Sequence, residues 1–235
     1  MEKIKYILFI GIIFVAGILL FKPPVFAEED YSGFTQALVK EGLTLDDFQK
    51  YTTYYYKNPD PDKLLLITKA FTSQDRYISN PEGFSAFKHF VASVAYNNTG
   101  FVSKLKELGK TSSGTQQLAM EKILGHLDNY QSPLADCTIY LDYLWAEFMA
   151  TGSEEAVRKI ISVLDIYVDR NNKHPTEQDL EDAILKNSAK WSLKSNAEQH
   201  EKVYRIVEQE AETATGIRKQ ELEEILGSIA ENKRN

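Results

Sequence analysis

The chain has a single cysteine, Cys137, among 235 residues. One thiol excludes an internal disulfide, a zinc cluster built on cysteine thiolates and a Cys-x-x-Cys redox pair. Basic residues are also in deficit, because 27 Lys and Arg against 34 Asp and Glu give a formal net charge of −7. A nucleic-acid-binding surface needs a basic stripe facing the phosphates, so this balance predicts no nucleic-acid partner.

Several motifs that carry chemistry are missing as well. The 12 glycines are scattered, and the sequence has no Gly-x-Ser-x-Gly elbow, phosphate loop or dinucleotide fingerprint. His200 begins the segment nearest to His-Glu-x-x-His, but Tyr204 stands where the second imidazole is required, so a solvated helix surface is the better interpretation. The four histidines lie in separate segments without ligand spacing: His89, His126, His174 and His200. We therefore predict no cofactor and no metal site.

The first 27 residues have the three-part layout of an export signal. Lys3 and Lys5 precede an apolar run over 6–21, and a small residue, Ala27, ends the segment. We predict a signal peptide over 1–27 with cleavage after Ala27, and hence export across the inner membrane to the periplasm or the exterior. The alternative is a membrane anchor over 6–21, although 16 helical residues span only about 24 Å of a hydrocarbon layer of roughly 30 Å.

The rest of the chain is rich in helical periodicity, and we find no alternating run long enough to predict a strand. The fold class that we predict is all-α, an irregular, solenoid-like bundle of antiparallel helix hairpins, because the connections are short and no regular repeat is found. The expected helices are 32–41, 45–57, 61–72, 81–97, 100–108, 113–128, 133–151, 154–168, 177–194, 197–213 and 217–230. Composition changes at residue 176, so we expect a main helical domain over 28–175 and C-terminal helices over 176–235 that cap the array or form a small subdomain.

Local signals mark several helix ends. Capping boxes with Asp at the fourth position are expected at Thr44 and Thr176. Gly152 is expected in the left-handed conformation, with Ser153 capping the next helix. Asn80 and Thr99 are further N-cap candidates. Between Pro133 and Thr151 an apolar stripe includes Cys137 and Trp145, which predicts a buried, inert thiol rather than a nucleophile, in the centre of the core.

Two segments resemble a family. The run Leu144-Trp145-Ala146-Glu147-Phe148-Met149-Ala150-Thr151-Gly152, within 141–164, and the run Trp191-Ser192-Leu193, within 189–207, look like segments of a group of uncharacterised exported bacterial all-helical, repeat-like proteins. Together they cover less than a quarter of the mature chain. The resemblance implies a bacterial envelope setting, and it brings no activity.

One helix face could bind a ligand. Asp136, Tyr140, Tyr143 and Glu147 follow one another at i, i+4, i+7 and i+11. Aromatic rings flanked by carboxylates suit sugars or basic peptide segments, through stacking and charge-assisted hydrogen bonds. The same tyrosines could instead pack at a helix interface.

A second aromatic group is Tyr51, Tyr54, Tyr55 and Tyr56, which follows Phe48. Phe48, Tyr51 and Tyr55 share a core face, which leaves Tyr54 and Tyr56 as anchors for a partner or as packing residues.

These observations favour an exported helical protein that binds another protein or an envelope polymer without catalytic activity, and that meets the membrane only through an uncleaved signal segment. The alternative is a cell-envelope glycan hydrolase or lyase that uses carboxylates such as Asp136 or Glu147 in a helical cleft. A purely structural or oligomerising module is a third possibility.

Overall fold

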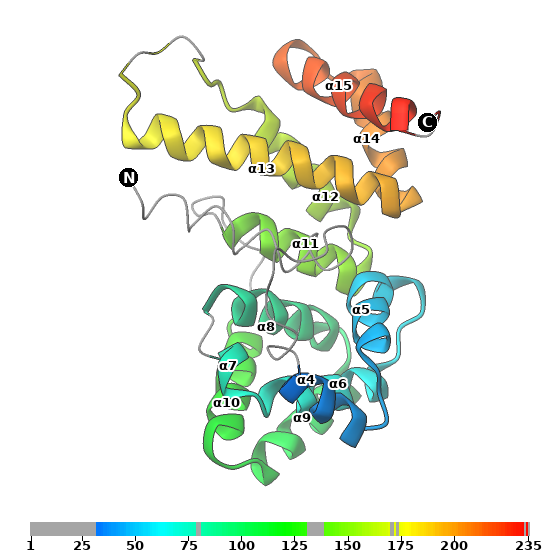
Figure 1. The fold of residues 1–235 in the computed structure, drawn as a ribbon, viewed down its shortest axis with the longest axis vertical. Coiled ribbons are helices and arrows are strands. Elements are labelled where there is room, and N and C mark those ends of the chain that lie inside the picture. The colour runs from blue at the N-terminus through cyan, green and yellow to red at the C-terminus, as the bar shows by residue number, and fades with distance from the viewer. Residues whose placement is uncertain are drawn as a thin grey trace. The chain divides into compact units, whose positions relative to one another are not determined.

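The computed structural model describes residues 32–78, 81–130, 139–169, 172, 174–232 and 234. Over these residues the fold is all-α and contains no strand, which confirms the predicted class (Figure 1). None of the helices in these ranges combines the length and the apolar character that a membrane span requires. The predicted signal peptide over 1–27 lies outside the described residues, as do Asn80, Asp136 and Cys137.

The contacts of the chain divide it between Gly152 and Ser153 into two compact units. This boundary precedes the composition change at residue 176. The N-terminal unit contains α4 (Ser32–Lys40), α5 (Leu45–Tyr54), the 3-10 helix η2 (Tyr55–Lys57), α6 (Pro61–Thr72), α7 (Asp75–Ile78), α8 (Pro81–Tyr96), α9 (Thr99–Thr111), α10 (Gly114–Asp128) and α11 (Ile139–Thr151). The C-terminal unit contains α12 (Glu154–Ser162), the 3-10 helix η3 (Val163–Asp165), α13 (Glu177–Gln199), α14 (Glu201–Thr213) and α15 (Gly216–Asn232).

Helix α8 is the centre of the N-terminal unit, where it packs against α10 and α11 (Figure 1). Aromatic residues of three helices fill the core: Phe87 of α8 stacks on Phe71 of α6 at 4.0 Å between ring centroids, and Phe34 of α4 meets Phe71 edge to face. Helix α11 is apolar almost all round, and Trp145 is buried, as the sequence predicts. Burial of this aromatic surface is the main source of stability in such a helical unit.

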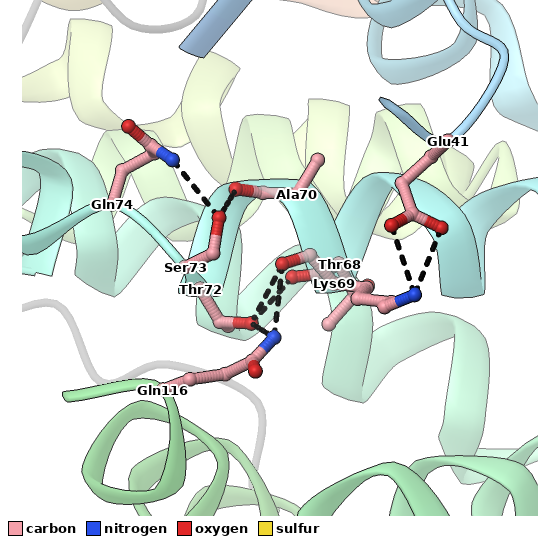
Figure 2. Close-up of polar contacts among 8 residues, drawn as sticks. All are labelled: Glu41, Thr68, Lys69, Ala70, Thr72, Ser73, Gln74 and Gln116. Atoms are coloured by element: carbon pink, nitrogen blue, oxygen red, sulfur yellow. Dashed lines mark hydrogen bonds and ion pairs between the residues drawn. The ribbon is translucent and has the colours of Figure 1, made fainter. Parts of the chain in front are cut away.

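Polar contacts hold α6 between two neighbours (Figure 2). The Lys69 ammonium forms an ion pair with Glu41 from the end of α4, at 2.9 Å. On the other side, the side-chain amide of Gln116 from α10 donates to the Lys69 carbonyl oxygen at 3.1 Å and to the Thr72 hydroxyl at 3.3 Å. The Lys69 carbonyl oxygen also accepts from the Ser73 amide at 3.2 Å, so the Gln116 amide is an additional donor that ties α10 to the last turn of α6.

The C-terminal unit contains a buried ion pair. Glu221 of α15 meets Lys186 of α13 at 3.1 Å, and both side chains are buried. Lys190 approaches the second oxygen of Glu221 at 2.5 Å, and Lys186 also donates to the Ile166 carbonyl oxygen. Burial raises the pKa of Glu221, but the two lysines outweigh this effect, so its pKa lies below the usual value. The ion pair therefore joins α13 to α15 inside the C-terminal unit.

Most of the predicted helix ends agree with the structure. Both capping boxes form, Gly152 has a φ of 71°, and the Ser153 hydroxyl accepts from the Ala156 amide. The prediction for Thr99 was wrong: Asn98 is the N-cap, and its side chain accepts from the Phe101 amide at 2.9 Å.

Other elements differ from the prediction: α9 ends at Thr111 rather than 108, α14 begins at Glu201 rather than 197, and the segment of α12 and η3 ends at Asp165 rather than 168. Helix α13 continues to Gln199, where we expected an end at 194, because the Asn196 side chain turns back to donate to the Ser192 carbonyl oxygen inside the helix. The four-residue helix α7 was not predicted.

Candidate functional site

The structure gives the four residues of the predicted binding face different surroundings. Asp136 lies outside the described residues. Tyr140 is buried, with 5% of its surface exposed, whereas Tyr143 and Glu147 are half-buried. One carboxylate oxygen of Glu147, Oε2, is buried and has no hydrogen-bond partner in the described part of the chain. Tyr143 and Glu147 are one helical turn apart and form the part of the face that lies beside α8.

A pair of histidines lies next to this face. Nδ1 of His89, on α8, is 3.0 Å from Nε2 of His126, on α10, although the two residues are 37 positions apart in the sequence. The sequence analysis missed this pair because it considered ligand spacing only within single segments. A signal was nonetheless present, since His89 stands between Phe87 and Phe90 in a helix whose other positions are mostly apolar. A histidine in such surroundings is expected to be buried and hydrogen-bonded.

Two tyrosine rings enclose His89. Tyr143 stacks on the imidazole with 4.6 Å between ring centroids and an interplanar angle of 16°. Tyr130, which follows α10, stacks on it at 5.2 Å and 25°. We call these two tyrosines, His89, His126 and Ser93 the histidine–tyrosine cluster. It joins α8, α10 and α11, the helices that form the centre of the N-terminal unit.

The hydroxyl groups of the cluster have defined roles. Ser93 Oγ donates to the His89 carbonyl oxygen at 2.8 Å, one turn earlier on α8. A serine has one hydroxyl proton, so the Tyr130 hydroxyl must be the donor in its 3.0 Å contact with Ser93 Oγ. Burial raises the pKa of Tyr130, the bond with Ser93 opposes this, and the nearby Glu147 charge raises it further. Tyr130 is therefore a neutral hydrogen-bond donor at neutral pH.

Both imidazoles are neutral at neutral pH. Burial, reinforced by the charges of His126 and Lys88, lowers the pKa of His89 to about 3. Burial and the charge of Lys88 lower the pKa of His126 to about 4. Each neutral ring has one donor and one acceptor nitrogen, so one hydrogen bond joins the pair. The other nitrogen of His89, Nε2, is buried and has no hydrogen-bond partner among the described residues. The pair therefore tolerates added positive charge poorly.

Metal binding would need further ligands beside these two nitrogens. A zinc site takes four ligands when it is structural and three protein ligands when it is catalytic. Within the ranges that the structure describes, no group of three or more His, Cys, Asp or Glu residues could hold a metal ion.

The cluster reaches the surface at Tyr96, the last residue of α8. The Tyr96 ring is 61% exposed and lies 5.0 Å from the Tyr130 ring, tilted by 37°. The Glu147 carboxylate and the Tyr96 hydroxyl both contribute to the raised pKa of Tyr130. We call Tyr96, Tyr130 and Glu147 the tyrosine–carboxylate surface. Sequence analysis missed Tyr96 because it stands alone at the end of its helix.

The second aromatic group is mostly packed. Phe48 and Tyr55 are buried, as predicted, but Tyr51 is half-buried, with the Lys63 ammonium 4.0 Å from its ring centroid. Tyr54 and Tyr56 are half-buried too. Tyr56 lies 4.9 Å from the Phe148 ring and covers Gly152, so neither tyrosine is an exposed anchor.

His200 is also placed differently from the prediction. The sequence predicted a solvated helix surface, whereas the structure buries His200 completely at the junction of α13 and α14. The kink between the two helices turns this side chain inward, which a continuous helical pattern could not show.

Comparison with protein-family models, curated proteins and solved structures finds no match to this chain.

Proposed function

We propose that the protein is an exported helical protein that binds another protein or an envelope polymer, without catalytic activity of its own. The observation that supports this is the tyrosine–carboxylate surface, in which the exposed Tyr96 ring lies against Tyr130 beside Glu147. Ring faces offer apolar area to a sugar ring, and a carboxylate accepts hydrogen bonds from its hydroxyl groups. The same surface would accept a basic peptide segment.

The arrangement of the surface supports binding because its parts are already ordered. The Tyr130 hydroxyl is held by Ser93, and the histidine stack behind it fixes the ring. A preorganised surface loses little side-chain entropy when a ligand binds. We further propose that the helices form an irregular, solenoid-like array preceded by the signal peptide over 1–27. For the signal peptide, the intact mass of the protein recovered from its cell envelope should correspond to a chain that starts at Glu28.

The binding proposal is tested by sedimentation with insoluble envelope glycan, peptidoglycan first. We expect full-length protein to sediment with the glycan, and Tyr96→Ser together with Glu147→Gln to weaken binding by about tenfold or more. Tyr167→Ser is the matched control, because Tyr167 is 73% exposed and belongs to the other unit. Tyr140 is unsuitable for this test because it is buried, so its substitution would damage folding.

Three outcomes are informative. Binding that survives in the Tyr96 and Glu147 variant would contradict the proposed surface. Failure of full-length protein to bind the glycans or a lysine-rich peptide would contradict the proposed function. Soluble glycan fragments that disappear with Glu147→Gln would instead support the alternative, a cell-envelope glycan hydrolase or lyase.

A further inference from the structure

Two lysines on α8 and α10 have no counter-charge among the residues that the structure describes. Other lysines of the N-terminal unit pair with carboxylates from other segments, in the pairs Lys63 with Asp47, Lys69 with Glu41 and Lys104 with Asp62. Lys88 and Lys122 have no such pair. Unpaired lysines such as Lys50 and Lys106 are exposed, but Lys88 is half-buried. A partly buried ammonium group without a counter-charge is unfavourable unless a ligand supplies one.

The two lysines lie on facing helices. The Lys122 ammonium crosses from α10 to α8, where it lies 5.8 Å from the centroid of the Phe84 ring. Phe84 is one helical turn before Lys88, and on α10 Lys122 is one turn before His126. Lys88 is thus one turn from the ring that Lys122 covers and next to His89, which contacts His126 across the packing of α8 and α10.

The charges in this place act on one another. Burial lowers the pKa of Lys88, and the charge of Lys122 lowers it further. Lys88 in turn lowers the pKa of both histidines. No carboxylate of the described residues forms an ion pair with Lys88 or Lys122, and the Glu121 carboxylate, next to Lys122 in the sequence, accepts a hydrogen bond from Gln117.

We infer that Lys88, Lys122 and His126 form a binding site for a phosphate group. A phosphate offers three or four acceptor oxygens, which matches three donors that approach from two helices better than the two oxygens of a carboxylate do. When His126 Nε2 accepts from His89, its Nδ1 carries the proton and can donate to the ligand. The phosphate could be free or part of a lipid headgroup, because the recognised chemistry is the same.

Calorimetric titration of the full-length protein with inorganic phosphate, at an ionic strength held constant with sodium chloride, tests the site. We expect Lys88→Gln together with Lys122→Gln to weaken phosphate binding by about tenfold or more, since each removes a charged hydrogen-bond donor. Lys50→Gln together with Lys106→Gln removes the same charge from exposed positions and should change the affinity by about twofold or less. If the first variant does not fold, the exposed Lys122→Gln alone should weaken binding by about threefold or more.

A second measurement separates a specific site from general charge. Bound phosphate should raise the pKa of the His126 imidazole, followed by nuclear magnetic resonance, and by linkage phosphate should bind more tightly at acid pH. Vesicles of phosphatidylglycerol and of phosphatidylcholine distinguish the sources: binding to the anionic vesicles supports a lipid headgroup, and binding of inorganic phosphate alone supports a free phosphate. Equal affinity in the lysine variant and its control, or an unchanged His126 pKa at saturating phosphate, would overturn the inference.

Discussion

The buried histidine pair predicts that the N-terminal unit loses stability in mild acid. In the folded state, burial and the Lys88 charge lower the pKa of His89 to about 3 and that of His126 to about 4. The groups that face the pair are the Lys88 ammonium, the Tyr130 and Tyr143 hydroxyls and, beyond Tyr130, the Glu147 carboxylate. The unfolded chain binds protons near the ordinary histidine pKa of 6.5. The free energy of unfolding is therefore highest above this pH and falls as the pH decreases through it.

The magnitude follows from proton linkage. Between about pH 7.5 and 5.5, an unfolded histidine goes from about one-tenth to about nine-tenths protonated, which stabilises the unfolded state by about 1.4 kcal/mol. The folded state takes up almost no protons in this interval. Because His89 and His126 both contribute, the free energy of unfolding should decrease by about 2 to 3 kcal/mol. The loss should level off near the folded pKa values of about 4 and about 3.

The assay is urea unfolding of a Trp191→Phe protein, in which Trp145 is the remaining tryptophan and reports the N-terminal unit alone. Protonation of the buried His200 then does not contribute to the measured transition, since this residue belongs to the C-terminal unit. The variant His126→Gln should lose about half of the pH dependence, because one titrating group is gone. A free energy of unfolding that is equal at the two pH values, to within about 0.5 kcal/mol, would refute the reasoning.

Three further predictions concern stability, measured by urea unfolding. Gly152→Ala should lower the free energy of unfolding by about 1 to 3 kcal/mol, because φ is 71° at this position and the new Cβ would lie 3.1 Å from an aromatic ring. Gly125→Ala, inside α10 with no atom near the new Cβ, should instead raise it by up to about 1 kcal/mol. The opposite order of the two variants would contradict this prediction. Glu221→Ala should lower the free energy of unfolding of the C-terminal unit by about 3 kcal/mol, because Lys186 would stay buried without its carboxylate. Replacement of both residues by apolar ones should lower it less. Equal losses in the two variants would show that the charges matter little. Trp145→Ala should cost about 3 to 5 kcal/mol, and a loss below about 1 kcal/mol would contradict its place in the core.

The sequence predicted the features that depend on neighbouring residues. The capping boxes at Thr44 and Thr176 formed because the hydroxyl and the carboxylate that make them are three residues apart. Gly152 and Ser153 ended one helix and began the next for the same local reason. Helical periodicity likewise predicted most of the helices and the burial of Trp145.

The sequence could not predict contacts between distant segments. His89 and His126 meet because α8 packs against α10, and their sequence spacing carries no trace of this contact. Helix α7 has four residues, too few to show a period. We expected a helix to end at 194, but Asn196 is buried and bonds within the helix, and α13 continues to Gln199.

The candidate face of α11 was predicted from a pattern on one helix, but its exposure depends on the neighbouring helices. Helix α8 covers part of the face, so Tyr143 stacks on His89 while the ring that the structure exposes, Tyr96, comes from α8 itself. A pattern on one helix identifies residues that share one face of that helix. Which of them reach solvent is decided by packing that the pattern does not contain.

The proposed phosphate site and the tyrosine–carboxylate surface lie at different places along α8, so each proposal can be tested without the other. Lys88 and Tyr96 are eight residues apart, which corresponds to about 12 Å along a helix. Tyr96→Ser should therefore leave the affinity for inorganic phosphate within about twofold of its original value, because an uncharged side chain at that distance contributes little to an anion site. A larger loss of phosphate affinity, in a protein that still unfolds at the same urea concentration, would show that the two sites are one.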